Sequence, residues 1–255
     1  MNTFKSILVF LIIFSFDVLY TQTDYEVVRY FNSLSHCSDS NAYMEDFDCV
    51  YLKVEYPRLL NCNCIETNDI ILSFVYSNFF DKSYNNFNDY SKEFFEYYSN
   101  TQEIYEAPGW FYTIGIDTII VSERIVSISL GSYKYMGGAH GVSKMVTLNY
   151  DKETRRILDF GSIVNEGSKS NVNTILNSYI NSKAGDLDFF DPEMYNYGEI
   201  GSRFIMSSNA FIFKFDFYDE IYRKSGNYDL IVPYKSLQRY INPQYKFLLD
   251  FKNNR

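Results

Sequence analysis

Three β-rich runs follow one another between residues 111 and 150, and they constrain the fold more than any other part of the sequence. They are Phe111–Ser122, Arg124–Tyr135 and Lys144–Tyr150, and each is rich in the β-branched and aromatic side chains that strands favour. Only Glu123 separates the first two runs, and a short glycine-rich bend separates the last two. Because short connections join antiparallel neighbours, the runs predict consecutive antiparallel strands.

Other strands are expected on both sides of this block. Cys49–Tyr56 alternates in the manner of a strand, and Pro57 is expected to end it because proline cannot donate to a β-ladder. Phe211–Phe217 places its phenylalanines on one face and Lys214 on the other, which predicts one packed and one solvated face. Tyr228–Tyr234 is expected to form the last strand.

The spacing of apolar residues predicts helices at Asn68–Phe80, Tyr90–Glu103 and Ser170–Ala184. Asn68 and Ser170 are suited to cap the first and third of these helices, because their side chains can accept from free backbone N–H groups. Helices inserted at two places among long strands favour an α+β fold over a regular alternation of strand and helix. We therefore predict a mainly antiparallel sheet with two or three packed helices.

The first 22 residues have the layout of a secretory signal peptide. Lys5 precedes the apolar run Ile7–Phe16, which is shorter than the roughly 20 residues that a membrane-spanning helix needs. We expect cleavage near Tyr20–Thr23, which would leave an exported protein, periplasmic or extracellular, with no transmembrane span. An uncleaved membrane anchor is the alternative.

Four cysteines in an exported chain predict two disulfides. They are Cys37, Cys49, Cys62 and Cys64. Cys62 and Cys64 are too close to bond to each other comfortably, so each is expected to reach Cys37 or Cys49. A zinc site that also uses His36 is the alternative, although the usual Cys-x-x-Cys spacing is absent.

Charge narrows the range of partners. The net charge is −9 and the sequence pI is about 4.8, so no basic stripe is present to neutralise nucleic-acid phosphates. A basic partner suits such a chain better. Asp186, Asp188, Asp191 and Glu193 raise the question of calcium, but the run lacks the glycine and terminal glutamate of an EF-hand loop. We expect no metal and no cofactor.

Several segments occur in the order seen in a known bacterial extracytoplasmic module. They are Val54–Pro57, Ser127–Gly141, Asn149–Thr154, Ile157–Phe160 and Ile231–Leu237. The chain resembles the ectodomain of the lysozyme-sensing anti-sigma-V factor of the RsiV type. It is also similar to the non-catalytic domain that precedes the deacetylase domain in PdaC-type peptidoglycan deacetylases. The resemblance covers roughly residues 50–237, and many stand-alone members of this kind have no assigned function.

The resemblance implies a division of the chain into five parts. They are a signal peptide (1–22), a cysteine-bearing N-terminal segment (23–48), a non-catalytic PdaC/RsiV-like N-terminal part (49–150), an RsiV-like C-terminal part (151–240) and a tail (241–255). The anti-sigma factors carry a transmembrane helix before the module and the deacetylases carry a catalytic domain after it. We expect neither activity here. Arg155 stands where the resemblance would place glycine, so a different turn shape is expected.

The candidate site centres on the bend between the second and third β-rich runs. Gly137, Gly138 and Gly141 are expected to supply positive φ or close backbone approach. Three side chains around the bend, and two in the segment 218–226 that replaces an apolar partner loop with charge, are expected to contact a ligand. These binding residues are Tyr133, Tyr135, His140, Tyr218 and Tyr222.

These observations favour an exported, non-enzymatic binding module of the cell envelope that recognises a basic protein such as lysozyme, or a cell-wall glycan. No catalytic residue is assigned. One alternative is a hydrolase of envelope polymers in which His140 acts as general base, oriented by a carboxylate such as Asp151 or Asp159. Another is a structural or assembly component.

Overall fold

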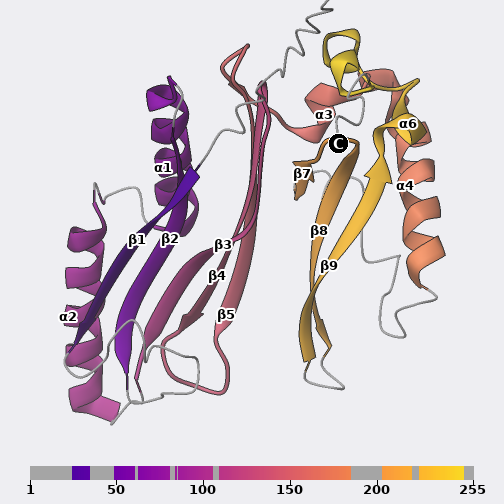
Figure 1. The fold of residues 1–255 in the computed structure, drawn as a ribbon. Coiled ribbons are helices and arrows are strands. Elements are labelled where there is room, and N and C mark those ends of the chain that lie inside the picture. The colour runs from indigo at the N-terminus through magenta and orange to yellow at the C-terminus, as the bar shows by residue number, and fades with distance from the viewer. Residues whose placement is uncertain are drawn as a thin grey trace, which may run out of the picture.

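The computed structural model describes residues 25–34, 49–60, 63–80, 84, 86–105, 109–184, 203–219 and 224–249. Two β-sheets lie side by side between two layers of helices (Figure 1). Helices α1 (Ile65–Phe79) and α2 (Phe87–Tyr105) cover the far side of the first sheet, and α4 (Lys169–Ala184) lies beyond the second. The predicted α+β class is therefore confirmed.

The first sheet has six strands in the order of the chain. They are β1 (Tyr25–Leu34), β2 (Val50–Leu59), β3 (Phe111–Val121), β4 (Ile125–Tyr135), β5 (Val142–Asp151) and β6 (Arg156–Ile157). All neighbours are antiparallel except β2 and β3, which run parallel. A parallel pair needs a long crossover, and helices α1 and α2 provide it. The three strands predicted between residues 111 and 150 are β3, β4 and β5.

The two faces of the first sheet differ in chemistry. The helix-covered face is apolar, and its buried residues include Leu52, Val54, Ile114, Ile128, Leu130 and Leu148. We call the opposite face, which is turned toward the second sheet, the inner face. Its buried polar residues are Ser127, Ser129, Asn149 and Asp151. An aromatic row, Tyr51, Phe111 and Tyr135, occupies one end of the inner face.

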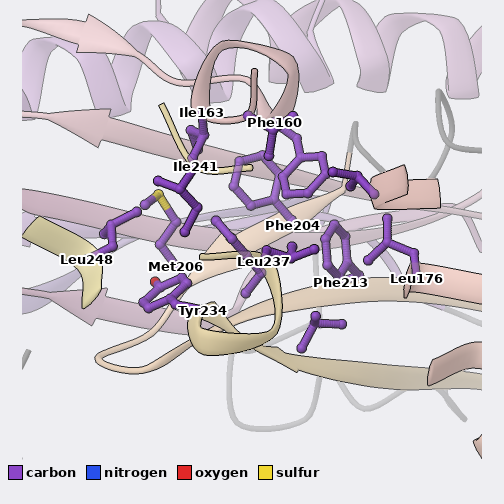
Figure 2. Packing of buried hydrophobic residues seen from close by; sticks show 14 of the residues in the cluster. Phe160, Ile163, Leu176, Phe204, Met206, Phe213, Tyr234, Leu237, Ile241 and Leu248 are labelled. Carbon is purple, nitrogen blue, oxygen red and sulfur yellow. The ribbon is translucent and has the colours of Figure 1, made fainter. Parts of the chain in front are cut away.

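The second sheet consists of β7 (Phe204–Met206), β8 (Ala210–Asp219) and β9 (Lys224–Pro233). Its core also takes in α3 (Phe160–Ile163), α4, α6 (Tyr234–Leu237) and the 3-10 helix η3 (Pro243–Leu249), while a short η1 (Glu166–Ser168) leads into α4. Figure 2 shows Phe160 among Phe204 and Phe213. The Phe160 ring meets each of these rings edge-on, at centroid distances of 5.5 and 5.1 Å.

Several boundaries differ from the sequence predictions. Strand β1 lies in the cysteine-bearing N-terminal segment (23–48), where the sequence predicted no strand. Strand β2 continues through Pro57, and β3 pairs with β2 only along Tyr51–Val54, so the missing proline N–H leaves no bond to β3 unmade. Residues 241–249 do not form a tail, because Ile241, Tyr245 and Leu248 are buried in the second core.

The predicted caps are also wrong. Helix α1 begins at Ile65, so Asn68 lies within it. The Asn68 amide instead accepts from the backbone N–H of Leu59 at 2.8 Å and donates to the Leu59 carbonyl at 3.1 Å, which ties α1 to β2. Ser170 lies inside α4, since η1 continues directly into that helix.

Candidate functional site

The bend between β4 and β5 is built by its glycines. Gly137 and Gly138 have φ values of 86° and 95°, a left-handed region that side chains disfavour. Gly141 is needed for space, because a Cβ there would lie 2.5 Å from the Cζ atom of Tyr133. Each of the three glycines therefore has a backbone or packing reason for its identity.

Two of the expected binding tyrosines hold this bend in place. The Tyr135 hydroxyl donates to the Gly138 carbonyl at 3.0 Å, and the Tyr133 hydroxyl accepts from the Gly141 N–H at 3.1 Å. Both rings also lie against Phe111, at centroid distances of 5.7 Å for Tyr133 and 5.5 Å for Tyr135. Both hydroxyls therefore hydrogen-bond to the backbone of the bend.

His140 lies exposed at the end of the bend. Its Nδ1 atom is 3.2 Å from the carbonyl oxygen of Gly141, and no carboxylate pairs with it among the described residues. Asp151 is held by Arg124, and Asp159 caps α3 by accepting from the Ser162 N–H at 2.8 Å. The described residues therefore contain no acid–base pair at His140.

The other expected site residues are only partly described. The backbone of Tyr218 pairs with Ser225 in the β8–β9 ladder, while its side chain and Tyr222 lie outside the described residues. Cys49 and Cys64 are disulfide-bonded in the structure. Cys37 and Cys62 lie outside the described residues, so the pairing stays a prediction.

The zinc and calcium alternatives both involve residues outside the described part of the chain, namely His36 and residues 186–193. Within the part that is described, no group of three or more His, Cys, Asp or Glu side chains could hold a metal ion. In that same part, no helix is both long and apolar enough to cross a membrane.

Strand β7 contacts the inner face through hydrogen bonds. The Ser127 hydroxyl accepts from the Met206 N–H at 3.1 Å, and the Asn149 amide donates to the Phe204 carbonyl at 2.8 Å. Ser127 also donates to the Asn149 side-chain oxygen at 2.7 Å. Two side chains of the first sheet thereby satisfy the backbone of β7, much as a neighbouring strand would.

Lys214 of β8, which is buried, makes a second polar contact between the two sheets. Only 4% of the Lys214 side chain is exposed, and its ammonium group donates to Asp229 at 2.8 Å and to Thr118 at 3.0 Å. It also lies 3.0 Å from Asp117, which is the extra residue of a β-bulge in β3. The prediction of a solvated face at Lys214 is wrong, because its partners come from β3 and β9.

The charges in this link shift one another's pKa values. Burial raises the pKa of Asp117, but hydrogen bonds from Lys214 and Thr118 and the lysine charge outweigh it, so the pKa lies below its ordinary value. Burial lowers the pKa of Lys214, but its bonds to Asp229 and Asp117 outweigh that effect and raise it. Asp117 and Lys214 are therefore both charged at neutral pH.

Arg124 and Asp151 make a third polar contact. The guanidinium binds both carboxylate oxygens, with its closest nitrogen 2.8 Å from Oδ2, and it stacks on the Phe247 ring at 3.9 Å. The carboxylate, whose side chain is fully buried, also accepts from the Glu153 N–H at 2.9 Å. Burial raises the pKa of Asp151, yet these bonds lower it overall.

A groove lies between β1 and α2. Its volume is about 630 Å³, and its lining is Asn32, Leu34, Asn88, Ser91, Lys92, Phe95, Glu96, Ser99 and Asn100. None of these residues belongs to the predicted site. The available signal was the helical spacing of the polar residues in α2, and the opposite wall is strand β1, which the sequence did not predict.

Comparisons with known proteins identify a matching family model and solved structures of similar fold. Residues 44–143 match the family model described as deacetylase PdaC. No curated protein matches the chain.

A DUF3298 family protein from Pseudomonas aeruginosa PAO1 is 16% identical, with a TM-score of 0.64 over 88% of this chain and 96% of that one. A member of the same family from Bacteroides fragilis NCTC 9343 is 14% identical, with a TM-score of 0.61 over 91% and 98%. The resemblance to PdaC-type modules is thus confirmed: residues 44–143 match that family's model, and 88% and 91% of the chain share the fold of the two DUF3298 proteins.

Proposed function

We propose that the protein is an exported, non-enzymatic binding module of the cell envelope, whose ligand is a cell-wall glycan or a basic protein such as lysozyme. The observation that carries the non-enzymatic part is the geometry of the bend. His140 is exposed and pairs with no described carboxylate, whereas a general base needs a tuned pKa and an orienting partner.

The envelope location rests on two lines of support. The match to the deacetylase PdaC model covers residues 44–143, and the resemblance drawn from the sequence is to a bacterial extracytoplasmic module. The predicted signal peptide at residues 1–22 and the disulfide-bonded state of Cys49 and Cys64 suit an oxidising compartment. The net charge of −9 suits a basic protein partner.

Binding and product release by the purified mature protein test this proposal. Surface plasmon resonance measures binding to lysozyme, co-sedimentation measures binding to insoluble peptidoglycan, and chromatography of the supernatant measures soluble fragments. We expect binding to at least one ligand and no fragments. Fragments that disappear in His140→Ala would show a hydrolase instead, and the absence of both binding and fragments would overturn the proposal.

A further inference from the structure

We propose that the groove between β1 and α2 binds a neutral glycan strand that carries N-acetylated sugars. This inference rests on the proposed binding function and names the ligand class and the site. The groove residues of α2 recur every three or four positions, so they lie on one face of the helix. They extend from Asn88 to Asn100, which at about 1.5 Å per residue makes a stripe about 18 Å long.

The lining has the chemistry that hydroxyls and acetamido groups require. Side-chain amides donate and accept at once, and serine hydroxyls do the same, so they can pair with sugar hydroxyls in either direction. Amides or hydroxyls make up most of the lining, namely Asn32, Asn88, Ser91, Ser99 and Asn100. Phe95 is almost fully buried and gives the groove an apolar floor beside Leu34.

One end of the groove is preorganised. The Tyr30 hydroxyl lies 2.8 Å from the Ser91 hydroxyl and donates to Asn88 at 3.0 Å, while the Asn32 amide donates to Ser91 at 3.0 Å. Of the remaining polar groups, the Ser99 hydroxyl donates to the Phe95 carbonyl at 3.0 Å and can still accept from a ligand. The side chains of Lys92, Glu96 and Asn100 are exposed and make no hydrogen bond or ion pair with the described residues.

The charge of the groove favours a neutral ligand. Among the described residues that line it, the charged ones are Lys92 and Glu96, so this described lining has a formal charge of zero while the whole chain carries −9. A strongly basic protein would gain no charge attraction at this site. A neutral sugar chain requires none, and Lys92 and Glu96 can each make charge-assisted hydrogen bonds to hydroxyls or to acetamido groups.

An extended peptide fits this groove less well. Strand β1 is at the edge of the first sheet, where a peptide could add as a further strand. Such pairing needs free backbone N–H groups along the edge. The Ser33 N–H, next to the groove, already donates to the side-chain oxygen of Asn32 at 2.9 Å. At the end of β1 that borders the groove, the groove side chains rather than this N–H group are therefore available for recognition.

Isothermal titration calorimetry of the mature full-length chain with a soluble N-acetylglucosamine tetrasaccharide tests the site. We expect saturable binding by the wild type. Glu96→Gln and Asn100→Ala should each weaken the affinity about three- to tenfold, as expected for the loss of one or two hydrogen bonds. Ser99→Trp should abolish binding by filling the groove.

The matched control is Glu93→Gln, since Glu93 is exposed on the same helix but does not line the groove. It should bind like the wild type. Unchanged affinity in Glu96→Gln, Asn100→Ala and Ser99→Trp would overturn the inference, as would an equal loss in Glu93→Gln. Circular dichroism of each variant shows whether it is folded.

The outcomes also separate this inference from the proposed function. Wild-type protein that binds lysozyme but neither the tetrasaccharide nor peptidoglycan would refute the glycan site and leave the binding function standing. Peptidoglycan binding that survives Ser99→Trp would place the glycan site elsewhere. If the wild-type protein binds none of the three, both the glycan site and the proposed binding function are refuted.

Discussion

In the middle of β4 and β5, the two faces of the first sheet are equally buried but are held by different forces. Along β4, Ile128 faces α1 and α2 and Ser127 faces the second sheet, and both side chains are fully buried. Along β5, Leu148 and Asn149 make the same pair. The helix-covered face relies on apolar area, whereas the inner face relies on hydrogen bonds and ion pairs to β7, β8 and the β5–β6 turn.

Because of this difference, the two faces fix the positions of the elements packed against them with different precision. Hydrophobic attraction has no direction and grows with the area removed from water, so the apolar face fixes that the helices pack but only loosely how. A hydrogen bond requires distance and angle. The bonds of Ser127 and Asn149 to β7 fix the second sheet relative to the first. The inner face should therefore be the more sensitive to loss of a single atom.

The largest effect is expected for Arg124→Ala. The change leaves the fully buried Asp151 carboxylate without its cation, and breaking a buried pair in this way costs about 3–5 kcal/mol. Urea unfolding followed by circular dichroism measures the free energy of unfolding. Arg156→Ala is the control, because Arg156 is exposed, and it should change that free energy little. Equal losses in the two variants would show that the pair contributes nothing particular.

Ile128→Ala and Ser127→Ala compare the two faces at neighbouring positions. Ile128→Ala should cost about 2–5 kcal/mol because it leaves a cavity under the helices. Ser127→Ala should cost about 2 kcal/mol, since the Met206 N–H and the Asn149 oxygen both lose a partner. Hydrogen exchange separates the mechanisms. The Met206 amide should exchange faster in Ser127→Ala than in Ile128→Ala at matched global stability, and equal rates would contradict the role of Ser127.

The sequence predicted the apolar face better than the inner one. Strands β3, β4 and β5 were predictable because their composition is strongly β-favouring and short turns join them. The burial of Lys214 was not, because its partners Asp117 and Asp229 are brought to it by a bulge in another strand and by the β8–β9 hairpin. Polar residues on an inner strand face give the same pattern as a solvated face.

The candidate site was likewise only partly predictable from the sequence. The glycines of the bend could be interpreted from sequence, since positive φ and close approach are local properties. The groove could not, because it needs β1 and α2 together. Strand β1 mixes polar and aromatic residues on both faces and has exposed Tyr25 and Val27, so it lacks the alternation that marks a strand.

A smaller effect is expected from acid, and it should act on the inner face. The pKa values of Asp117 and Asp151 are lowered in the folded state, so their contribution is present above their ordinary value of 3.8 and is lost as pH falls through the lowered values. The pKa of Lys214 is raised, so its contribution is lost only as pH rises above its ordinary 10.5. Lys214→Met should therefore reduce the loss of stability between pH 5 and about pH 2, measured by urea midpoints. An unchanged acid dependence would contradict the Asp117–Lys214 coupling.

The smallest effect is expected at the turn that follows Asp151. Arg155 replaces an expected glycine, yet it adopts φ = 56°, the left-handed conformation that glycine favours. That conformation costs a non-glycine residue about 1–2 kcal/mol, and the greater unfolded-state freedom of glycine offsets about 0.5–1 kcal/mol of it. Arg155→Gly should therefore raise the melting temperature by about 1–3 °C. Arg155→Ala is the control, because it removes the exposed ion pair with Glu66 without relieving the backbone, and it should leave the melting temperature unchanged or slightly lower. A rise in the alanine variant equal to that in the glycine variant would show that the side chain, rather than the backbone conformation, limits the stability of this turn.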